Sequence, residues 1–402
     1  MTAGTDPGTL AADDLRALFA QGLERVRGDR VVARALEADP PPPGTRVLAW
    51  GKAAEAMLAG AVQAAGGRIA AALVVAPADA VPRMPEPAFP LRRVAGDHPV
   101  PGPRSLEAGI AIEAFLSDTR PDEPLLVLLS GGASSLAELP RAGVSLQELQ
   151  ALNRELLASG LEIAAMNARR REWSRLKGGG ARALCAARDL RVYLISDVPG
   201  DDPAVIGSGP FVAADGSHAD HRILASNGRM RAAIREAATA RGWAVCDHGL
   251  LPAADAAPAL AAALRDARPG LHLWGGEAPV RLPPHPGRGG RAQHLAAAVL
   301  EQWLEQGAPR PLALLAGASD GVDGNSDAAG AVFDAGSVAS ARGPGGCQAR
   351  LRPALAAADT ESFWAGLGDG RGGPGLLRGE LAGYAGVRTN VMDIVIAAVG
   401  ER

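Results

Sequence analysis

The two lysines of the sequence are the residues whose type points most directly to phosphate chemistry. The chain has 41 basic residues, and all but Lys52 and Lys177 are arginines. The compact ammonium of lysine meets phosphate oxygens and shifts its pKa in ways that the planar guanidinium cannot. Both lysines lie in glycine-rich motifs, Gly51-Lys52 and Lys177-Gly178. We therefore expect both to have roles that arginine cannot fill, the alternative being chance survival on a surface.

Glycines, hydroxyls and acids gather where buried strands are predicted to end. Five strand ends read GK (51–52), SGGASS (130–135), SD (196–197), GGE (275–277) and AGASDG (316–321). In open parallel sheets, ligands bind beyond the carboxyl ends of the strands, where exposed backbone N–H groups attract anions. One such turn is weak support, but five indicate a phosphate site. The residues assigned to substrate or phosphate binding on this ground are Ser130, Gly131, Gly132, Ser134 and Glu277.

Two basic segments add candidates for anion binding. The segment 167–180 (NARRREWSRLKGGG) contains Arg175 and Lys177, and the segment 287–291 (GRGGR) contains Arg288. Arginine forks hold carboxylate or phosphate in a bidentate manner. We assign these three side chains to substrate or phosphate binding, although a solvated helix end would also explain the first segment.

Acids are needed to hold the Mg²⁺ that accompanies ATP. Asp197 lies in SDVPGDDP (196–203) and Asp320 in SDGVDGNSD (319–327), each after a predicted strand. The second segment lacks the spacing of a helix–loop–helix calcium site. Acids in such turns are often only cap or turn residues. His98, between prolines in GDHPVPGP, is a base or a pocket wall, and a structural role is the commoner one.

The elements that must position these residues form an α/β pattern. Strand–turn–helix–strand units in both halves are typical of parallel sheets. We expect two α/β domains with mainly parallel sheets facing an interdomain cleft, with residues 1–250 in the first and 251–402 in the second. The predicted strands are 45–50, 70–76, 124–129, 190–196, 271–274 and 311–315. The predicted helices are 11–36, 53–65, 104–116, 145–166, 228–241 and 293–305.

Composition excludes several classes of partner. A formal charge of −3 and only 3% aromatic residues argue against nucleic acid and anionic membranes. The longest apolar runs are of strand length, so no membrane span is expected. Three widely spaced cysteines and the absence of a signal peptide at the start indicate a cytoplasmic protein. A homodimer remains open.

At this point the motifs as a set are recognisable. The chain resembles the class II glycerate 2-kinases, which combine a glycerate-kinase amino-terminal domain with a MOFRL domain. The stretches that carry the resemblance run in family order over nearly the whole chain: GKAAEAM (51–57), GDHPVPGP (96–103), LLSGGASSL (128–136), SRLKGGG (174–180), ISDVPGDDPAVIGSGP (195–210), GGEAPV (275–280), GRGGRAQ (287–293), AGASDGVDGNSDAAGA (316–331) and TNVMDI (389–394).

The resemblance implies ATP, Mg²⁺ and phosphorylation of D-glycerate at its 2-hydroxyl. It further implies catalytic roles for Lys52 of the GK motif and for an arginine of GRGGR, taken as Arg291. Asp197 is expected to orient the attacking hydroxyl or hold the metal, and Asp320 is the second metal candidate. Such roles suit phosphoryl transfer, in which positioning and cationic neutralisation supply most of the rate.

Three motifs depart from the family pattern. Glu172 stands where the family has histidine, Ala292 and His294 replace an asparagine and a glutamate, and Val387-Arg388 interrupts a glycine-rich TGPTGTN motif. We expect these changes to alter the acceptor pocket, so that the acceptor is glycerate or another small hydroxy acid. The alternatives are a hydroxypyruvate reductase-like oxidoreductase and a non-catalytic binding protein. The GK and SGG turns lack the G-x-G-x-x-G dinucleotide fingerprint that a reductase would need.

Overall fold

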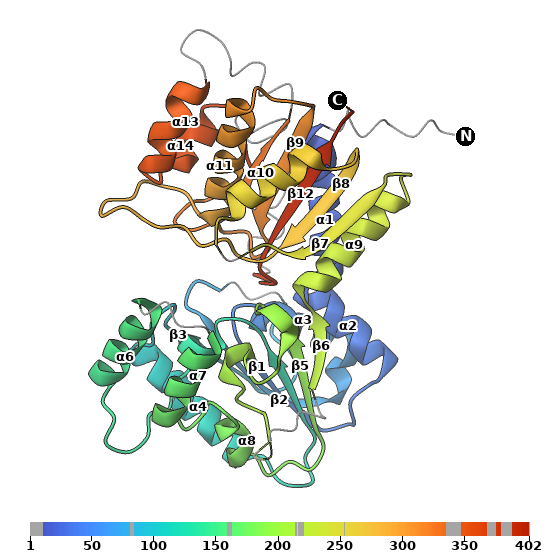
Figure 1. Cartoon of the computed structure of the whole chain (residues 1–402). Coiled ribbons are helices and arrows are strands. Elements are labelled where there is room, and N and C mark those ends of the chain that lie inside the picture. Colours follow the sequence, from blue (N-terminus) through green and yellow to red (C-terminus); the bar gives the residue numbers. More distant parts are fainter. Residues whose placement is uncertain are drawn as a thin grey trace. The chain divides into compact units, whose positions relative to one another are not determined.

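The computed structural model divides the chain into two compact units (Figure 1). The amino-terminal unit comprises residues 26–226 and 386–390, and the carboxy-terminal unit comprises 1–25, 227–385 and 391–402. The structure describes residues 11–80, 84–158, 163–213, 215, 221–252, 254–334, 347–367, 375–378 and 388–401. No helix within these ranges is long and apolar enough to cross a bilayer.

The amino-terminal unit contains a six-stranded parallel sheet in the order β3-β2-β1-β4-β5-β6. The strand order reverses between β1 and β4, which makes their carboxyl ends the switch point where ligands bind in such sheets. The strands are β1 Thr45–Trp50, β2 Ile69–Pro77, β3 Leu91–Gly96, β4 Leu125–Leu129, β5 Leu190–Ile195 and β6 His221–Ala225.

Helices pack on this sheet through small and aliphatic side chains. Leu48 and Trp50 of β1 join a buried cluster with Ala108 and Ile112 of α4. Because side chains alternate along a strand, Val47 and Ala49 face the other side of the sheet. The helices of this unit are α2 Gly28–Ala38, α3 Ala54–Ala65, α4 Pro103–Ser117, α5 Ala133–Leu136, α6 Leu146–Ala158, α7 Ile163–Trp173 and α8 Gly180–Leu184.

The carboxy-terminal unit contains a mixed six-stranded sheet in the order β11-β10-β9-β12-β8-β7. The last strand, β12, lies between β9 and β8 and is antiparallel to both. The start of β12 is therefore at the same edge of the sheet as the carboxyl ends of β8 and β9. The strands are β7 Val245–Leu250, β8 Gly270–Gly275, β9 Leu312–Ala318, β10 Gly330–Phe333, β11 Gly375–Leu376 and β12 Asp393–Val399.

The helices of this unit surround a core rich in leucine, alanine and tryptophan. Trp303 of α11 and Trp364 of α14 are among its largest buried side chains. The helices are α1 Ala12–Val26, α9 Asn227–Thr239, α10 Ala256–Asp266, α11 Arg291–Glu305, α13 Cys347–Ala356 and α14 Thr360–Ala365.

The predicted fold class of two α/β domains is confirmed, but its details differ in the second sheet. Strands β7, β8, β9 and β11 run in one direction, whereas β10 and β12 run against them. The notebook of strand patterns from sequence marks neither β10 nor β12, and it also misses β3 and β6. The predicted helix 11–36 is two helices, α1 and α2, and the predicted helix 145–166 corresponds to α6 and part of α7.

The division into units differs from the predicted boundary at residue 250. Strand β7 pairs with β8 of the second sheet, and α9 packs against both strands, so the carboxy-terminal unit begins at Asn227. Residues 1–25 also belong to that unit, where Phe19 lies close to Gly317 of β9. A linear boundary cannot describe this arrangement because the chain enters and leaves the amino-terminal unit twice.

The contact between α2 and α3 yields a test of the fold. Gly60 in α3 faces the backbone of Asp29 in α2, and a Cβ at Gly60 would lie 2.2 Å from the Asp29 carbonyl oxygen. Glycine-to-alanine changes ordinarily stabilise helix interiors by about 1 kcal/mol. Here we expect Gly60→Ala to destabilise the protein by roughly 1–3 kcal/mol, because the helices must separate. Urea unfolding measures the change. The control, Gly67→Ala, introduces a Cβ with no atom within 4 Å and should leave the midpoint unchanged.

Candidate active site

The carboxyl ends of β1 and β4 are joined by a close backbone approach. The Lys52 N–H donates to the Gly131 carbonyl at 2.9 Å, and the Ala53 N–H donates to the Ser130 hydroxyl oxygen at 3.0 Å. Gly51 has φ +133°, and a Cβ there would lie 2.2 Å from Ser130 Oγ. Only glycine can hold this position. Ser130 is buried and its hydroxyl fixes the start of α3, so we revise its predicted phosphate contact to a structural role.

Side chains from three strand ends converge on the glycine turn after β4. A Cβ at Gly131 would lie 2.0 Å from Asp197 Oδ2, and a Cβ at Gly132 would lie 3.0 Å from Lys52 Cγ and 3.3 Å from His98 Nε2. Asp197 follows β5, Lys52 follows β1, and His98 follows β3. The two glycines therefore leave room for a carboxylate, an ammonium and an imidazole beside one turn. The sequence predicted Lys52, Asp197 and the glycines at this turn, and it left His98 open.

The predicted hydroxyl of Ser134 is part of a short chain of hydrogen bonds. Ser208 Oγ donates to Asn167 Oδ1 at 2.9 Å, and Ser134 Oγ lies 2.8 Å from Ser208 Oγ. In this arrangement the Ser134 proton points to Ser208. The oxygen of Ser134 is then an acceptor, and binding of a phosphate by this hydroxyl would require the chain to reverse.

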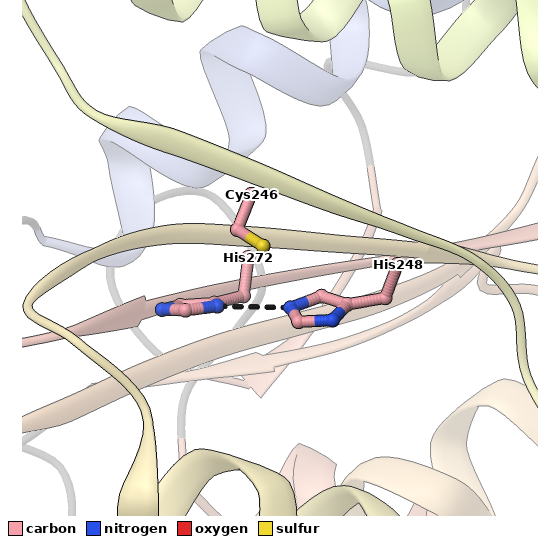
Figure 2. Close-up of side chains that lie close together, drawn as sticks. All are labelled: Cys246, His248 and His272. Atoms are coloured by element: carbon pink, nitrogen blue, oxygen red, sulfur yellow. Dashed lines mark hydrogen bonds between the residues drawn. The ribbon is translucent and has the colours of Figure 1, made fainter.

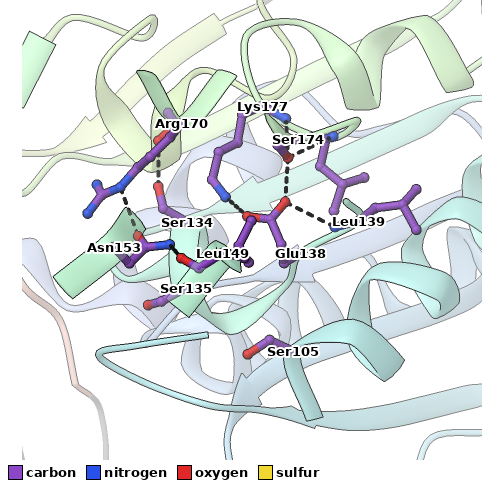
Figure 3. Close-up of polar contacts among 12 residues, drawn as sticks. Ser105, Ser134, Ser135, Glu138, Leu139, Leu149, Asn153, Arg170, Ser174 and Lys177 are labelled. Atoms are coloured by element: carbon purple, nitrogen blue, oxygen red, sulfur yellow. Dashed lines mark hydrogen bonds and ion pairs between the residues drawn. The ribbon is translucent and has the colours of Figure 1, made fainter. Parts of the chain in front are cut away.

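Lys177 lies in a buried polar network (Figure 3). Its ammonium pairs with Glu138, and the two side chains are 2% and 1% exposed. Ser174 Oγ donates to the same carboxylate at 2.5 Å, and the Leu139 N–H donates to it at 3.1 Å. A charge with this partner and this burial does not meet a substrate. The prediction that Lys177 binds phosphate is therefore corrected to a structural role.

The other charged residues of the 167–180 segment also point to protein partners. Arg175 donates to Glu113 of α4 at 2.5 Å, which corrects its assignment to substrate binding. Glu172 is exposed at the end of α7, with Arg169 at 4.0 Å. The departure at Glu172 thus lies on the surface of the helix and does not add an acid to the turn that holds Asp197.

The segment around Arg388 belongs to the amino-terminal unit although it directly precedes β12 in sequence. Arg388 donates to Asp79, which follows β2, at 2.5 Å. This hydrogen bond, opposed by partial burial, lowers the pKa of Asp79, and the charge of His98 acts in the same direction. Arg388 is thus close to the strand ends that carry Lys52 and His98. Val387 lies outside the described residues.

In the carboxy-terminal unit, Arg291 is the centre of an acidic cluster. Its Nε donates to Asp393 Oδ2 at 2.6 Å and its Nη2 to Asp393 Oδ1 at 3.1 Å, so the pair is bidentate. Nη2 also donates to Glu277 at 2.5 Å. Burial opposes the charge of Arg291, but these carboxylates outweigh it and raise the pKa of the guanidinium. The sequence named Arg291 and Glu277, whereas Asp393 appeared only as part of the TNVMDI motif.

Two further aspartates lie near this pair. Burial raises the pKa of Asp393, and the charge of Asp320 after β9 adds to the shift, while Arg291 lowers it. Asp323 accepts the Ala292 N–H at 3.1 Å and the Gln293 N–H at 2.8 Å at the start of α11. Burial raises the pKa of Asp323 to about 7, against the effect of these two hydrogen bonds. The sequence missed Asp323 because aspartates in a glycine-rich turn all appear alike.

Arg288 is directed away from this cluster. Its Nε donates to Glu361 of α14 at 2.8 Å and its Nη2 to Asp327 at 3.1 Å. Arg378 donates to the same Glu361 at 2.5 Å. The predicted phosphate contact of Arg288 would compete with two acids, so we reassign Arg288 to holding the GRGGR turn against α14.

Two pockets flank the start of α11, with volumes of about 570 and 530 Å³. Arg291 and His294 line both of them, together with Pro279 and Val280. Burial lowers the pKa of His294. Ala292, the other departure in this motif, is buried and faces the core. Of the two changes in GRGGRAQH, only His294 therefore alters a pocket wall.

The residues present fit a nucleotide phosphate and a divalent cation. The turn at Gly131 and Gly132 is a space that a Cβ would fill, and it is bordered by an ammonium and a carboxylate. Carboxylates are the usual protein ligands of Mg²⁺ at phosphate sites. Asp197 supplies one in the amino-terminal unit, and Asp320 lies beside Arg291 and Asp393 in the other.

Comparisons with known proteins agree with this fold and site. Residues 14–241 match the model described as "Domain of unknown function (DUF4147)", and residues 270–393 match the MOFRL family. A relative from Agrobacterium vitis named "Putative hydroxypyruvate reductase" is 34% identical over 64% of this chain and 79% of its own length. A D-glycerate 2-kinase from Thermotoga maritima is 29% identical over 59% of this chain and 66% of its own length.

A solved structure confirms the architecture. The crystal structure of a glycerate kinase from Thermotoga maritima matches with a TM-score of 0.79 at 24% identity, over 95% of this chain and 98% of that chain. The fold and the relatives support the class of enzyme that the sequence predicted, a kinase. The chain belongs to the glycerate 2-kinase family, whose members combine the DUF4147 and MOFRL domains.

The raised pKa of Asp323 predicts a pH dependence of stability. The folded protein keeps a proton on Asp323 up to about pH 7, whereas the unfolded chain releases it near the ordinary value of 3.8. The contribution is therefore complete below pH 4 and is lost as the pH rises through 7. Unfolding midpoints measured from pH 4 to 8 should fall more steeply for the native protein than for Asp323→Asn. Parallel curves would contradict the shift.

The buried Lys177–Glu138 pair predicts a distinctive pattern of stability and activity. Lys177→Met leaves a buried carboxylate without its counter-charge and should cost about 3–5 kcal/mol. Adding Glu138→Gln removes the charge but keeps an acceptor for Ser174, so the double variant should regain most of the stability. If Lys177 is structural, the refolded double variant also retains turnover. A stable but inactive double variant would return Lys177 to substrate binding.

Proposed function

We propose that this protein is an ATP- and Mg²⁺-dependent kinase that phosphorylates D-glycerate at its 2-hydroxyl. The observation that carries the proposal is the turn at Gly131 and Gly132, around which Lys52 and Asp197 gather at the switch point of a parallel sheet. Family membership supplies the reaction class. Bound Mg²⁺-ATP would supply the phosphoryl group and neutralise part of its charge.

Lys52 and Asp197 have complementary roles in this proposal. The ammonium of Lys52 would bind oxygens of the transferring phosphoryl group, where a preorganised positive charge stabilises the transition state. Asp197 would either orient the attacking hydroxyl or hold the metal. A carboxylate next to the same glycine turn suits both roles, because each requires an oxygen directed at the phosphate.

Arg291 would act through a guanidinium that is fixed before substrate arrives. Asp393 holds Nε and Nη2, and Glu277 holds Nη2 as well, so the fork does not need to be ordered during binding. Arg291 is 37% exposed and lines two pockets. We assign it to stabilising transition-state charge or to binding the acceptor carboxylate, with Asp320 as the second candidate for the metal.

The acceptor pocket supports a related hydroxy acid as the second candidate. His294 replaces the family's glutamate on a wall shared by both pockets, beside the apolar Pro279 and Val280. Loss of an acid at this position would favour a less basic acceptor or a more anionic one. A screen of ADP formation with Mg²⁺-ATP over hydroxy acids, sugar acids and their aminated analogues identifies it.

The reductase alternative has its support in the name of the Agrobacterium vitis relative. Neither the GK turn after β1 nor the SGG turn after β4 has the dinucleotide fingerprint. Oxidation of NADH by hydroxypyruvate, followed by absorbance, distinguishes the two activities. Turnover in that assay without ADP formation in the kinase assay would replace our proposal. Ligand binding without either activity would indicate a non-catalytic relative.

Replacement of Lys52 tests the proposed catalytic role. Lys52→Arg keeps the charge but moves it and spreads it, so we expect kcat for ADP formation to fall by at least about 100-fold with an unchanged fold. Arg68→Lys, an exposed change of the same two residue types, is the control and should be silent. Turnover of Lys52→Arg near the native value would remove the argument from lysine scarcity.

The double variant Lys52→Arg/Arg291→Lys asks whether both residues serve one reaction. Groups that act as a unit in the same transition state have strongly non-additive effects. We therefore expect the double variant to lose much less than the product of the two single losses. Circular dichroism and the unfolding midpoint verify that each variant is folded.

A further inference from the structure

Three potential metal ligands meet at the edge of the second sheet, apart from every residue assigned above (Figure 2). Cys246 and His248 lie on the edge strand β7, and His272 lies on β8. One ligand atom from each lies within 4.8 Å of the other two. All three residues belong to the carboxy-terminal unit.

The register of the sheet explains why these side chains meet. Cys246 pairs directly with His272, so their side chains leave the sheet on the same face. His248 is two residues beyond Cys246 and returns to that face. The register of β7 shifts between Asp247 and Leu250. Such a bulge redirects a side chain, and here the His248 ring lies over Trp274 with 4.2 Å between ring centroids.

The spacing of the two imidazoles suits a tetrahedral metal ion. His248 Nε2 and His272 Nδ1 are 3.0 Å apart. Two nitrogens bound to tetrahedral Zn²⁺ at about 2.0–2.1 Å are separated by roughly 3.3 Å. A change of a few tenths of an ångström in one exposed ring converts the hydrogen-bonded pair into a pair of ligands. Because β7 is an edge strand, His248 can move by this amount without disturbing a neighbouring strand.

The second nitrogen of His272 is already arranged as it is at metal sites. His272 Nε2 lies 2.9 Å from the Arg268 carbonyl oxygen, so Nε2 carries the proton and Nδ1 presents its lone pair to His248. Histidines that bind metals usually donate their other N–H to a carbonyl or carboxylate in this way. Burial also lowers the pKa of both histidines, which keeps the imidazoles neutral.

We propose that Cys246, His248 and His272 form a Zn²⁺ site with one position open to water. The donor set of one thiolate and two imidazoles suits Zn²⁺, whereas Mg²⁺ and Ca²⁺ require oxygens. On binding, the Cys246 thiol releases its proton and the sulfur forms the bond to zinc. The proton on His248 Nε2 moves to Nδ1 through solvent, so each bound Zn²⁺ releases one proton.

The site would fasten the edge strand β7 to β8. The ligands come from two adjacent strands, and the exposed Cys246 and His248 are linked to the buried His272. Zinc should therefore slow hydrogen exchange of the β7 amides without being required for phosphoryl transfer. This role is separate from the divalent cation of the kinase reaction, which binds to carboxylates.

Metal titration of the whole chain tests the site. Protein freed of metal by a chelator is titrated with Zn²⁺ by calorimetry and with Co²⁺ by absorption spectroscopy. We expect one ion per chain and a thiolate-to-cobalt charge-transfer band. Cys246→Ser should abolish the band, and His248→Phe should weaken Zn²⁺ binding more than about 100-fold while keeping the ring on Trp274. The control His285→Ala, an exposed histidine elsewhere in the unit, should leave both signals unchanged.

The outcomes separate zinc binding from a simple stack of aromatic rings. If the three side chains only pack on Trp274, the native protein gives no charge-transfer band, and Zn²⁺ binds with the same affinity to native and His248→Phe protein. Either result overturns the proposal. Because neither readout depends on turnover, failure here leaves the kinase assignment untouched, and loss of kinase activity does not affect the titration.

Discussion

The close approach of the backbone between β1 and β4 is the constraint on which the candidate site depends. Gly51, Gly131 and Gly132 have no Cβ, and a methyl at any of them would meet a neighbouring atom within about 3 Å. Without these glycines the strand ends would separate, and Lys52 and Asp197 would not share a turn. The pattern of glycines is thus a consequence of packing density at the switch point, and the phosphate chemistry uses the space that they leave.

Fixed charges in both units are balanced before any substrate binds. Asp393 and Glu277 hold Arg291, and Glu138 holds Lys177. The two pairs differ in exposure, since Lys177 is 2% exposed and Arg291 is 37% exposed. A buried pair that is sealed on all sides can only support the fold. A partly exposed guanidinium held by two carboxylates is preorganised yet accessible, which is what transition-state stabilisation requires.

Local patterns predicted the elements that have strong periodicity, and tertiary contacts decided the rest. The apolar runs of β1, β4 and β5 were correctly read as strands, whereas β12 was missed because its identity depends on insertion between β9 and β8. The partners of Arg175 and Arg288 were unpredictable for a similar reason. Glu113 is 62 residues from Arg175, and only the folded chain brings them together. Residue type indicated anion binding, but it could not distinguish a ligand from a protein carboxylate.

The scarcity of lysine has two physical causes in this chain. At Lys177, an ammonium fits a buried site with one carboxylate beside it, whereas a guanidinium would bring additional N–H donors that a buried site must satisfy. Packing alone therefore explains why this lysine persists. No such argument applies to Lys52, which is partly exposed at the glycine turn where an arginine could reach solvent. Its retention requires an interaction in which the compact charge matters, and the transferring phosphoryl group provides one.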